Sequence, residues 1–127
     1  MENNKAKILV IDDVQTNLVL VKAVLSKSYS VATALSGIKI LELLEIEKPD
    51  LILLDIMMAG MDGFEVLRVI RQTEDYKDVP VIMVSALGTP EEISKAYDMG
   101  ANDYVRKPIV LPRLLNAVKT QLTLVGK

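Results

Sequence analysis

Short, almost uninterrupted apolar runs alternate along the chain with amphipathic segments about a dozen residues long. Apolar runs of this kind are typical of strands in a parallel sheet that is covered on both faces. The pattern predicts strands near residues 7–11, 30–34, 51–54, 81–84 and 103–106, and helices near 15–26, 37–47, 64–72, 90–99 and 111–125. Strands that alternate with helices in this way indicate an α/β fold.

The fourth predicted helix has the clearest end signals. Thr89 can cap it, Pro90 suits its first position, and Glu92 completes a capping box. Gly100 follows its end, where a left-handed residue commonly stops a helix.

Polar side chains stand where the predicted strands end. Asp12 and Asp13 follow the first strand, Asp55 the third, Ser85 the fourth and Lys107 the last. The carboxyl ends of parallel strands share one edge, where open α/β sheets place their ligands. We therefore expect one pocket with three carboxylates, a hydroxyl and an ammonium group.

Composition narrows the classes of function. The chain has 127 residues, the length of one domain, and we expect a single domain over 1–127 with its core over about 7–122. The absence of cysteine excludes disulfides and thiolate metal sites and fits a cytoplasmic location, and the absence of histidine removes the usual general base. A net charge of −2 gives no basic field for direct binding of nucleic acid. The amino terminus lacks the pattern of a signal peptide, and no apolar run approaches the ~20 residues of a membrane span, so we expect no membrane insertion.

The order and spacing of several motifs resemble one family throughout most of the chain. The motifs are Ile-Leu-Val-Ile-Asp-Asp at 8–13, Leu-Ile-Leu-Leu-Asp at 51–55, Met61-Asp62-Gly63, Ser85-Ala86, Gly-Ala-Asn-Asp-Tyr at 100–104 and Lys107-Pro108. Together they are similar to the receiver domain of two-component response regulators. The resemblance implies a flavodoxin-like, doubly wound sheet of five parallel strands in the order 2-1-3-4-5, with five helices.

The resemblance also assigns roles to the strand-end residues. Asp55 corresponds to the aspartate that accepts a phosphoryl group. Asp12, Asp13, Asp55 and the backbone carbonyl of Met57 correspond to the site of Mg²⁺, with Mn²⁺ as an alternative. Asp13 and Asp55 would bind the ion directly and Asp12 mainly through water, and Asp13 could cap the first helix instead of, or as well as, binding the ion. Ser85 and Lys107 would bind phosphoryl oxygens, and the Lys107–Pro108 peptide would be cis.

The implied function is a signalling switch rather than an enzyme with a separate substrate. A histidine kinase or histidine phosphotransfer protein would donate the phosphoryl group, and Ser85 and Tyr104 would move in response. The surface of the fourth helix, fifth strand and fifth helix would then control a downstream protein or a covalently linked output domain.

Four apolar residues receive further predictions. By resemblance, Met57 and Leu87 flank the path of the water that hydrolyses the phosphorylated state, so hydrolysis should be slow. Leu18 and Val19 are expected to lie exposed on the first helix and to dock the phosphodonor, with Leu20 on the opposite, buried side.

Other functions fit the sequence less well. A haloacid-dehalogenase-type phosphatase would need a second acid where Met57 stands, and a dinucleotide binder would need a Gly-x-Gly-x-x-Gly loop after the first strand. An FMN binder would need hydroxyls and amides in that loop, which is acidic here. A receiver-like adaptor that is never phosphorylated stays as the main alternative.

The sequence departs from the family pattern at three positions. Ala59 replaces a common proline, which predicts a more mobile loop over 57–61. Arg113 and Ala117 replace an acid and an arginine that are usual in regulators with winged-helix outputs, so the dimer contacts of that subfamily are not expected here. The sequence alone does not set the oligomeric state or say whether an output domain belongs beyond Lys127.

Overall fold

The computed structural model describes residues 5–127. Its strands are β1 (Lys7–Ile11), β2 (Ser30–Ala34), β3 (Leu51–Asp55), β4 (Val81–Ser85) and β5 (Asp103–Arg106). Its α-helices are α1 (Gln15–Leu25), α2 (Ile40–Glu47), α3 (Gly63–Gln72), α4 (Pro90–Asp98) and α5 (Leu111–Leu124), and a short 3₁₀-helix, η1, spans Glu74–Tyr76.

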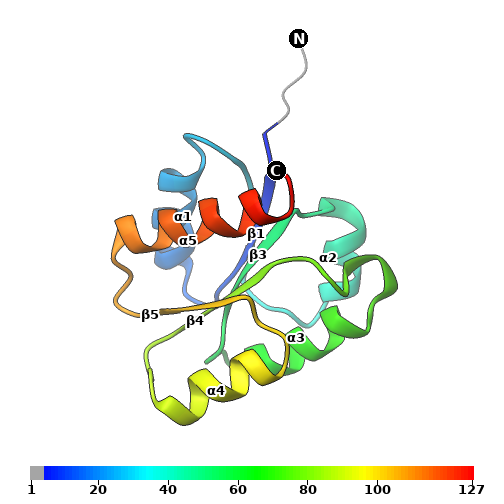
Figure 1. Ribbon diagram of the computed structural model, residues 1–127, viewed down its shortest axis with the longest axis vertical. Helices are drawn as coiled ribbons and strands as arrows, with labels where there is room; N and C mark the ends of the chain where they lie inside the picture. The colour runs from blue at the N-terminus through cyan, green and yellow to red at the C-terminus, as the bar shows by residue number, and fades with distance from the viewer. Residues whose placement is uncertain (1–4) are drawn as a thin grey trace.

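The strands form one parallel sheet in the order β2-β1-β3-β4-β5, as predicted. Helices α1 and α5 cover one face of the sheet, and α2, α3 and α4 cover the other (Figure 1). The register pairs Ile11 with Leu54, Asp55 with Val84, and Ser85 with Arg106, so the carboxyl ends of the inner strands reach the same edge. The predicted flavodoxin-like architecture is confirmed.

Alternate residues of each inner strand pack into two separate cores. In β1, Ile8 and Val10 pack with α1 and α5, whereas Leu9 and Ile11 pack with α2 and α3. Both sets are almost fully buried, which explains why the strands read as continuous apolar runs rather than as alternating ones. The two cores fix the strand ends firmly and thereby fix the polar residues that follow them.

Helix α4 begins as its end signals predict, with one difference. The Thr89 hydroxyl accepts a hydrogen bond from the Glu92 amide at 3.2 Å, and Pro90 is at the first position. The Glu92 carboxylate, predicted to return a bond to the Thr89 amide, instead accepts one from the Tyr104 hydroxyl within the described residues. Gly100 follows the helix with a φ of 101°.

Helix α1 presents a different face to the core from the one predicted. Leu18 is 3% exposed and lies in the core with Val21 and Leu25, whereas Leu20 is 57% exposed. The prediction that Leu18 is exposed and Leu20 buried was therefore wrong, while Val19 is exposed as predicted. The helix is apolar around most of its circumference, so its few polar residues defined the solvent side poorly.

Helix α3 begins at Gly63, where only a glycine fits. A side-chain Cβ at this position would collide with the Asp55 carbonyl oxygen and lie 2.7 Å from Ile56 Cα, and both are backbone atoms that no rotamer change can move. The Gly63 amide donates to the Ile56 carbonyl at 2.8 Å, which holds α3 against the end of β3. The glycine of the Met61-Asp62-Gly63 motif thus supports the site at Asp55.

We predict that Gly63→Ala lowers the free energy of unfolding by about 1–3 kcal/mol, the usual cost of forcing an extra carbon into a packed region. Denaturant unfolding followed by circular dichroism measures the loss. Gly60→Ala is the matched control in the same loop, because its new Cβ meets open space and only its φ of 86° disfavours the change. A Gly63→Ala variant as stable as the wild type would contradict the packing described here.

Candidate functional site

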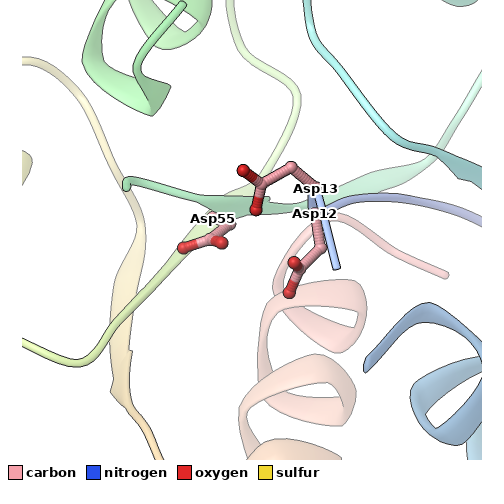
Figure 2. A group of neighbouring side chains, drawn as sticks. All are labelled: Asp12, Asp13 and Asp55. Atoms are coloured by element: carbon pink, nitrogen blue, oxygen red, sulfur yellow. The ribbon is translucent and has the colours of Figure 1, made fainter. Parts of the chain in front are cut away.

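The carboxyl edge of the sheet brings together the polar residues that the sequence placed at strand ends. Asp12 and Asp13 follow β1, while Asp55 and Ser85 are the last residues of β3 and β4. Figure 2 shows the carboxyl groups of Asp12, Asp13 and Asp55 gathered in one place, and oxygen atoms of all three lie within 4.8 Å of one another. The predicted acidic pocket is therefore present.

Lys107 reaches this cluster from the loop after β5. Its Nζ donates to Asp55 Oδ2 at 3.0 Å and lies 3.5 Å from Asp12 Oδ2. The Lys107 amide donates to the Ser85 carbonyl at 2.8 Å, extending the pairing of β4 with β5, and the Lys107–Pro108 peptide is cis, as expected. The backbone thus directs the ammonium group inward between two carboxylates.

Burial and neighbouring charges shift the pKa values of Asp55 and Lys107. Burial raises the pKa of Asp55 above its ordinary value, and the nearby charge of Asp12 adds to this, although the Lys107 ammonium and the Met57 amide oppose it. Burial alone would lower the pKa of Lys107, but hydrogen bonding and attraction to Asp55 and Asp12 outweigh it and raise that pKa. Lys107 therefore stays cationic and compensates a carboxylate that is only 3% exposed.

The Asp12 carboxylate is held by two further donors. Its Oδ1 accepts from the Val14 amide at 2.9 Å, and its Oδ2 accepts from Asn17 Nδ2 at 3.2 Å. Sequence reasoning missed Asn17. The signal was its position five residues after Asp12, which places it in the first turn of α1 beside the end of β1. Asp12 is thus oriented rather than freely rotating.

The Asp13 carboxylate makes a contact that depends on Ala59. Asp13 Oδ2 accepts a hydrogen bond from the Ala59 amide at 3.0 Å, and α1 has no side-chain cap, so the alternative of Asp13 as a helix cap was wrong. A proline at position 59 would have no N–H to donate. Replacement of the common proline therefore adds a tie between the 57–61 loop and Asp13, where the sequence predicted only greater mobility.

The three carboxylates suit a divalent metal ion. Carboxylate oxygens are the hard ligands that Mg²⁺ prefers, at about 2.0–2.1 Å from the ion, so two oxygens on one ion are at most about 4.2 Å apart. The oxygens here lie within 4.8 Å of one another, and small side-chain shifts would let them share one ion. The Met57 amide donates to Asp55 Oδ1 at 3.3 Å, so residue 57 lies directly beside the cluster. The residues present thus fit a metal ion bound by Asp12, Asp13 and Asp55.

Ser85 of β4 and Tyr104 of β5 lie on the side of Asp55 that faces away from β1. Ser85 is fully buried, and its Oγ accepts from the Leu87 amide at 3.3 Å. Tyr104 is 7% exposed; its hydroxyl accepts from the Gly88 amide at 3.0 Å and donates to the Glu92 carboxylate. The aromatic ring therefore occupies a buried position beneath the loop between β4 and α4.

The remaining predicted residues surround the mouth of the site. Met57 and Leu87 are 58% and 51% exposed, near the starts of the two loops that follow β3 and β4. Beside Lys107, a groove of about 240 Å³ runs between α1 and the start of α5. Its lining residues include Asn17, Leu20, Val21, Pro108 and Ile109.

Arg113 has an intramolecular role that sequence reasoning did not find. Its guanidinium group binds both carboxylate oxygens of Asp103 at 3.0 and 3.3 Å and donates to the Tyr104 carbonyl at 3.1 Å. Ala117, the other departure from the family pattern, is 2% exposed and packs in the core under α5. Both residues thus serve the fold of this chain.

Comparison with known proteins identifies the family. The model of the response regulator receiver domain matches residues 8–119. Response regulator PleD of Caulobacter vibrioides is 39% identical over 105 residues, which are 82% of this chain and 23% of that protein. A probable cyclic di-GMP phosphodiesterase of Vibrio cholerae is 35% identical over 119 residues, which are 94% of this chain and 27% of that protein.

Comparison with solved structures supports the same family. A putative response regulator from Chloroflexus aurantiacus superposes with a TM-score of 0.88 at 30% identity, covering 94% of this chain and 99% of that one. Chemotaxis protein CheY4 of Vibrio cholerae gives a TM-score of 0.87 at 29% identity, covering 92% and 98%. The chain belongs to the family of response regulator receiver domains.

Membership of this family defines the class of activity. Receiver domains are signalling domains rather than enzymes with a separate substrate, and they interact with histidine kinases and output domains. The chain spans 23% to 50% of the length of the curated relatives it matches. Within residues 5–127, no helix combines the length and the apolar character needed to cross a membrane.

Proposed function

We propose that this chain is a phosphorylation-activated switch in which Asp55 accepts a phosphoryl group with Mg²⁺ bound at the acidic cluster. The observation that carries the proposal is the placement of a buried Asp55 carboxylate 3.0 Å from Lys107 and beside Asp12 and Asp13. The Asp55 carboxylate thus contacts a cation and also lies beside the residues that can hold a metal ion.

The transfer step follows from these groups. An Asp55 oxygen attacks phosphorus and forms a P–O bond, while the P–N bond to a donor histidine breaks and its electron pair leaves with the imidazole. The donor must supply that histidine, because this chain has none. Mg²⁺, when bound, offsets the negative charge of the phosphoryl oxygens. Lys107 pairs with one of those oxygens as a point charge, and Ser85 donates its hydroxyl to another.

The residues around Asp55 respond to its new charge. Lys107 exchanges its carboxylate partner for a phosphoryl oxygen, Ser85 turns toward the phosphate, and Tyr104 responds to Ser85. The surface of α4, β5 and α5 then changes its population of conformers and controls a downstream protein or a covalently linked output domain. We place this activity in the cytoplasm.

Incubation with acetyl phosphate and Mg²⁺ tests the proposal. We expect intact-protein mass spectrometry to show addition of one phosphoryl group, and we expect chelation of Mg²⁺ with EDTA to prevent it. A chain that stays unlabelled, or that is labelled equally well in EDTA, would favour the adaptor that binds partners without phosphorylation.

The phosphodonor is expected to dock on α1 and on the loop before α5. Val19 is 59% exposed as predicted, and Leu20 and Val110 are 57% and 61% exposed beside the groove that leads to Lys107. Leu18, the other residue predicted from sequence, is buried and belongs to the core. The docking surface proposed here is therefore Val19, Leu20 and Val110.

We predict that Val19→Ser combined with Leu20→Ser slows phosphoryl transfer from a histidine phosphotransfer protein about tenfold or more, because apolar contact area is lost. Labelling by acetyl phosphate, a small donor that needs no docking, should be unchanged. Leu41→Ser combined with Ile46→Ser is the matched control, since both residues are exposed on α2. Equal loss with both donors would argue against a docking role.

Hydrolysis of the phosphorylated state is expected to be slow. Met57 and Leu87 stand exposed on the two loops nearest Asp55 and Ser85, and neither side chain can orient water by hydrogen bonding. We predict that Met57→Asn with Leu87→Glu speeds dephosphorylation by about one to two decades, the effect of one well-placed hydrogen bond on a barrier. The half-life of the labelled protein measures this. If the double variant is dephosphorylated no faster than the wild type, the side chains of Met57 and Leu87 do not control the attacking water.

A further inference from the structure

Glu92 makes a contact that neither the capping of α4 nor the proposed transfer step requires. It lies on the first turn of α4, and its carboxylate accepts a hydrogen bond from the Tyr104 hydroxyl of β5. The helix cap itself uses the Glu92 backbone amide and the Thr89 hydroxyl, so it does not depend on the Glu92 side chain. The carboxylate is therefore available for a separate role.

The Tyr104 hydroxyl joins α4 to the loop that precedes it. While it donates to Glu92, it accepts from the Gly88 amide at 3.0 Å, and its donating and accepting capacities are both used. Gly88 has a φ of 64°, a conformation that favours glycine. Three elements, β5, α4 and the 86–89 loop, thus meet at one hydroxyl group.

Arg106 closes the same loop from the other side. A Cβ added to Gly88 would collide with the Arg106 guanidinium Nε and lie 2.6 Å from its Cζ, so this side chain lies directly against the Gly88 backbone. Gly88 is therefore enclosed between the Tyr104 hydroxyl and the Arg106 side chain. Leu87, next to Gly88, donates its amide to Ser85 Oγ, which connects the enclosed loop to the hydroxyl beside Asp55.

We propose that Glu92 is a positioning residue that holds Tyr104 in its buried position and thereby fixes the 86–89 loop against Ser85 before phosphoryl transfer. Glu92 acts only through Tyr104 and touches none of the reacting atoms. The pKa of Tyr104 is raised first by burial and then by its bond to the Glu92 carboxylate, which agrees with a hydroxyl kept protonated as the donor. The expected effect of Glu92 on phosphoryl transfer rests on the function proposed for Asp55. The contact of Glu92 and Tyr104 with the 86–89 loop does not depend on that function.

Hydrogen exchange in the unphosphorylated protein tests the contact directly. In Glu92→Ala, we expect the Gly88 amide to exchange about tenfold faster than in the wild type. The Gly88 amide donates to the Tyr104 hydroxyl, and this variant removes the carboxylate that holds that hydroxyl in place. Site-resolved NMR titration of ¹³C-labelled tyrosine should show the pKa of Tyr104 falling toward 10, with the pKa of Tyr76 unchanged. Glu92→Gln, which retains an oxygen acceptor without the charge, should restore most of the Gly88 protection.

Glu91→Ala is the matched control, because Glu91 is an exposed acid on the same turn of α4. It should leave the Gly88 exchange rate and the pKa of Tyr104 at their wild-type values. Unchanged Gly88 exchange in Glu92→Ala, or equal changes in both alanine variants, would overturn the positioning role.

Labelling by acetyl phosphate extends the test to transfer. We expect Glu92→Ala to be labelled several-fold more slowly than the wild type and Glu91→Ala to match it. A wild-type chain that takes no label would refute the function proposed for Asp55, while the Gly88 exchange rates would still decide the role of Glu92. Normal labelling of Glu92→Ala together with fast Gly88 exchange would overturn the link between this loop and transfer.

Discussion

Asp55→Asn is expected to abolish labelling of the chain by acetyl phosphate. An amide oxygen is a far weaker nucleophile than a carboxylate, so we expect the rate to fall by about three decades or more. Asparagine has nearly the same shape as aspartate, but its single oxygen can accept from only one of the two donors, Lys107 or the Met57 amide, which bond to different oxygens of Asp55. Intact-protein mass spectrometry over time measures the loss.

Asp75→Asn is the control for this prediction. Asp75 is an exposed acid on η1, beside Pro49 and Pro80 at the opposite edge of the sheet, so its replacement should leave labelling unchanged. Circular dichroism should show both variants folded. Labelling of Asp55→Asn at a rate close to that of the wild type would place the acceptor elsewhere.

Asp13→Asn is expected to weaken Mg²⁺ binding by roughly 100-fold, because a direct carboxylate ligand and one negative charge are lost from the cluster. The Ala59 amide can still donate to an asparagine oxygen at this position, so the 57–61 loop should keep its tie. Titration calorimetry of the unphosphorylated protein measures the affinity, and acetyl phosphate labelling at fixed Mg²⁺ should fall in parallel.

The same Asp75→Asn variant serves as the control for metal binding, since it removes one charge far from the cluster. Its Mg²⁺ affinity should match that of the wild type. If Asp13→Asn binds Mg²⁺ as tightly as the wild type, Asp13 is not a ligand, and the acidic cluster does not work as proposed.

The strands and the polar residues at their ends were predictable because each depends on local sequence. β1, β2 and β5 have the predicted bounds, and β3 and β4 each extend one residue further, to include Asp55 and Ser85. Burial on both faces makes these strands apolar without interruption, and a parallel sheet then aligns their carboxyl ends. The site therefore follows from element order together with the position of each polar residue.

The start of one helix was predicted less well than the strands. The sequence predicts a start for α2 at residue 37, but the helix begins at Ile40. Residues 36–39 instead form a turn in which the Ser36 hydroxyl accepts from the Ile38 amide, and Gly37 is packed against Val66. A serine next to a glycine offers the backbone an alternative to helical hydrogen bonds, and apolar periodicity does not register that competition.

Contacts between distant loops could not be predicted from the sequence. The bond from the Ala59 amide to Asp13 spans 46 positions, and the bond from Tyr104 to Glu92 joins a strand to a neighbouring helix. Each depends on distances that only the packed fold sets. The resemblance could assign roles to Asp13 and Tyr104, but it could not provide the partners that hold them in this chain.

Chemical mapping of the phosphorylated residue tests the central claim most directly. The chain is labelled with acetyl phosphate and Mg²⁺, reduced with borohydride, digested and sequenced by mass spectrometry, because reduction converts an aspartyl phosphate into homoserine. We expect homoserine at position 55, with Asp12 and Asp13 intact. Phosphate that resists borohydride and maps to Ser85, or homoserine at position 12 or 13, would contradict the assignment of Asp55 as the phosphoacceptor.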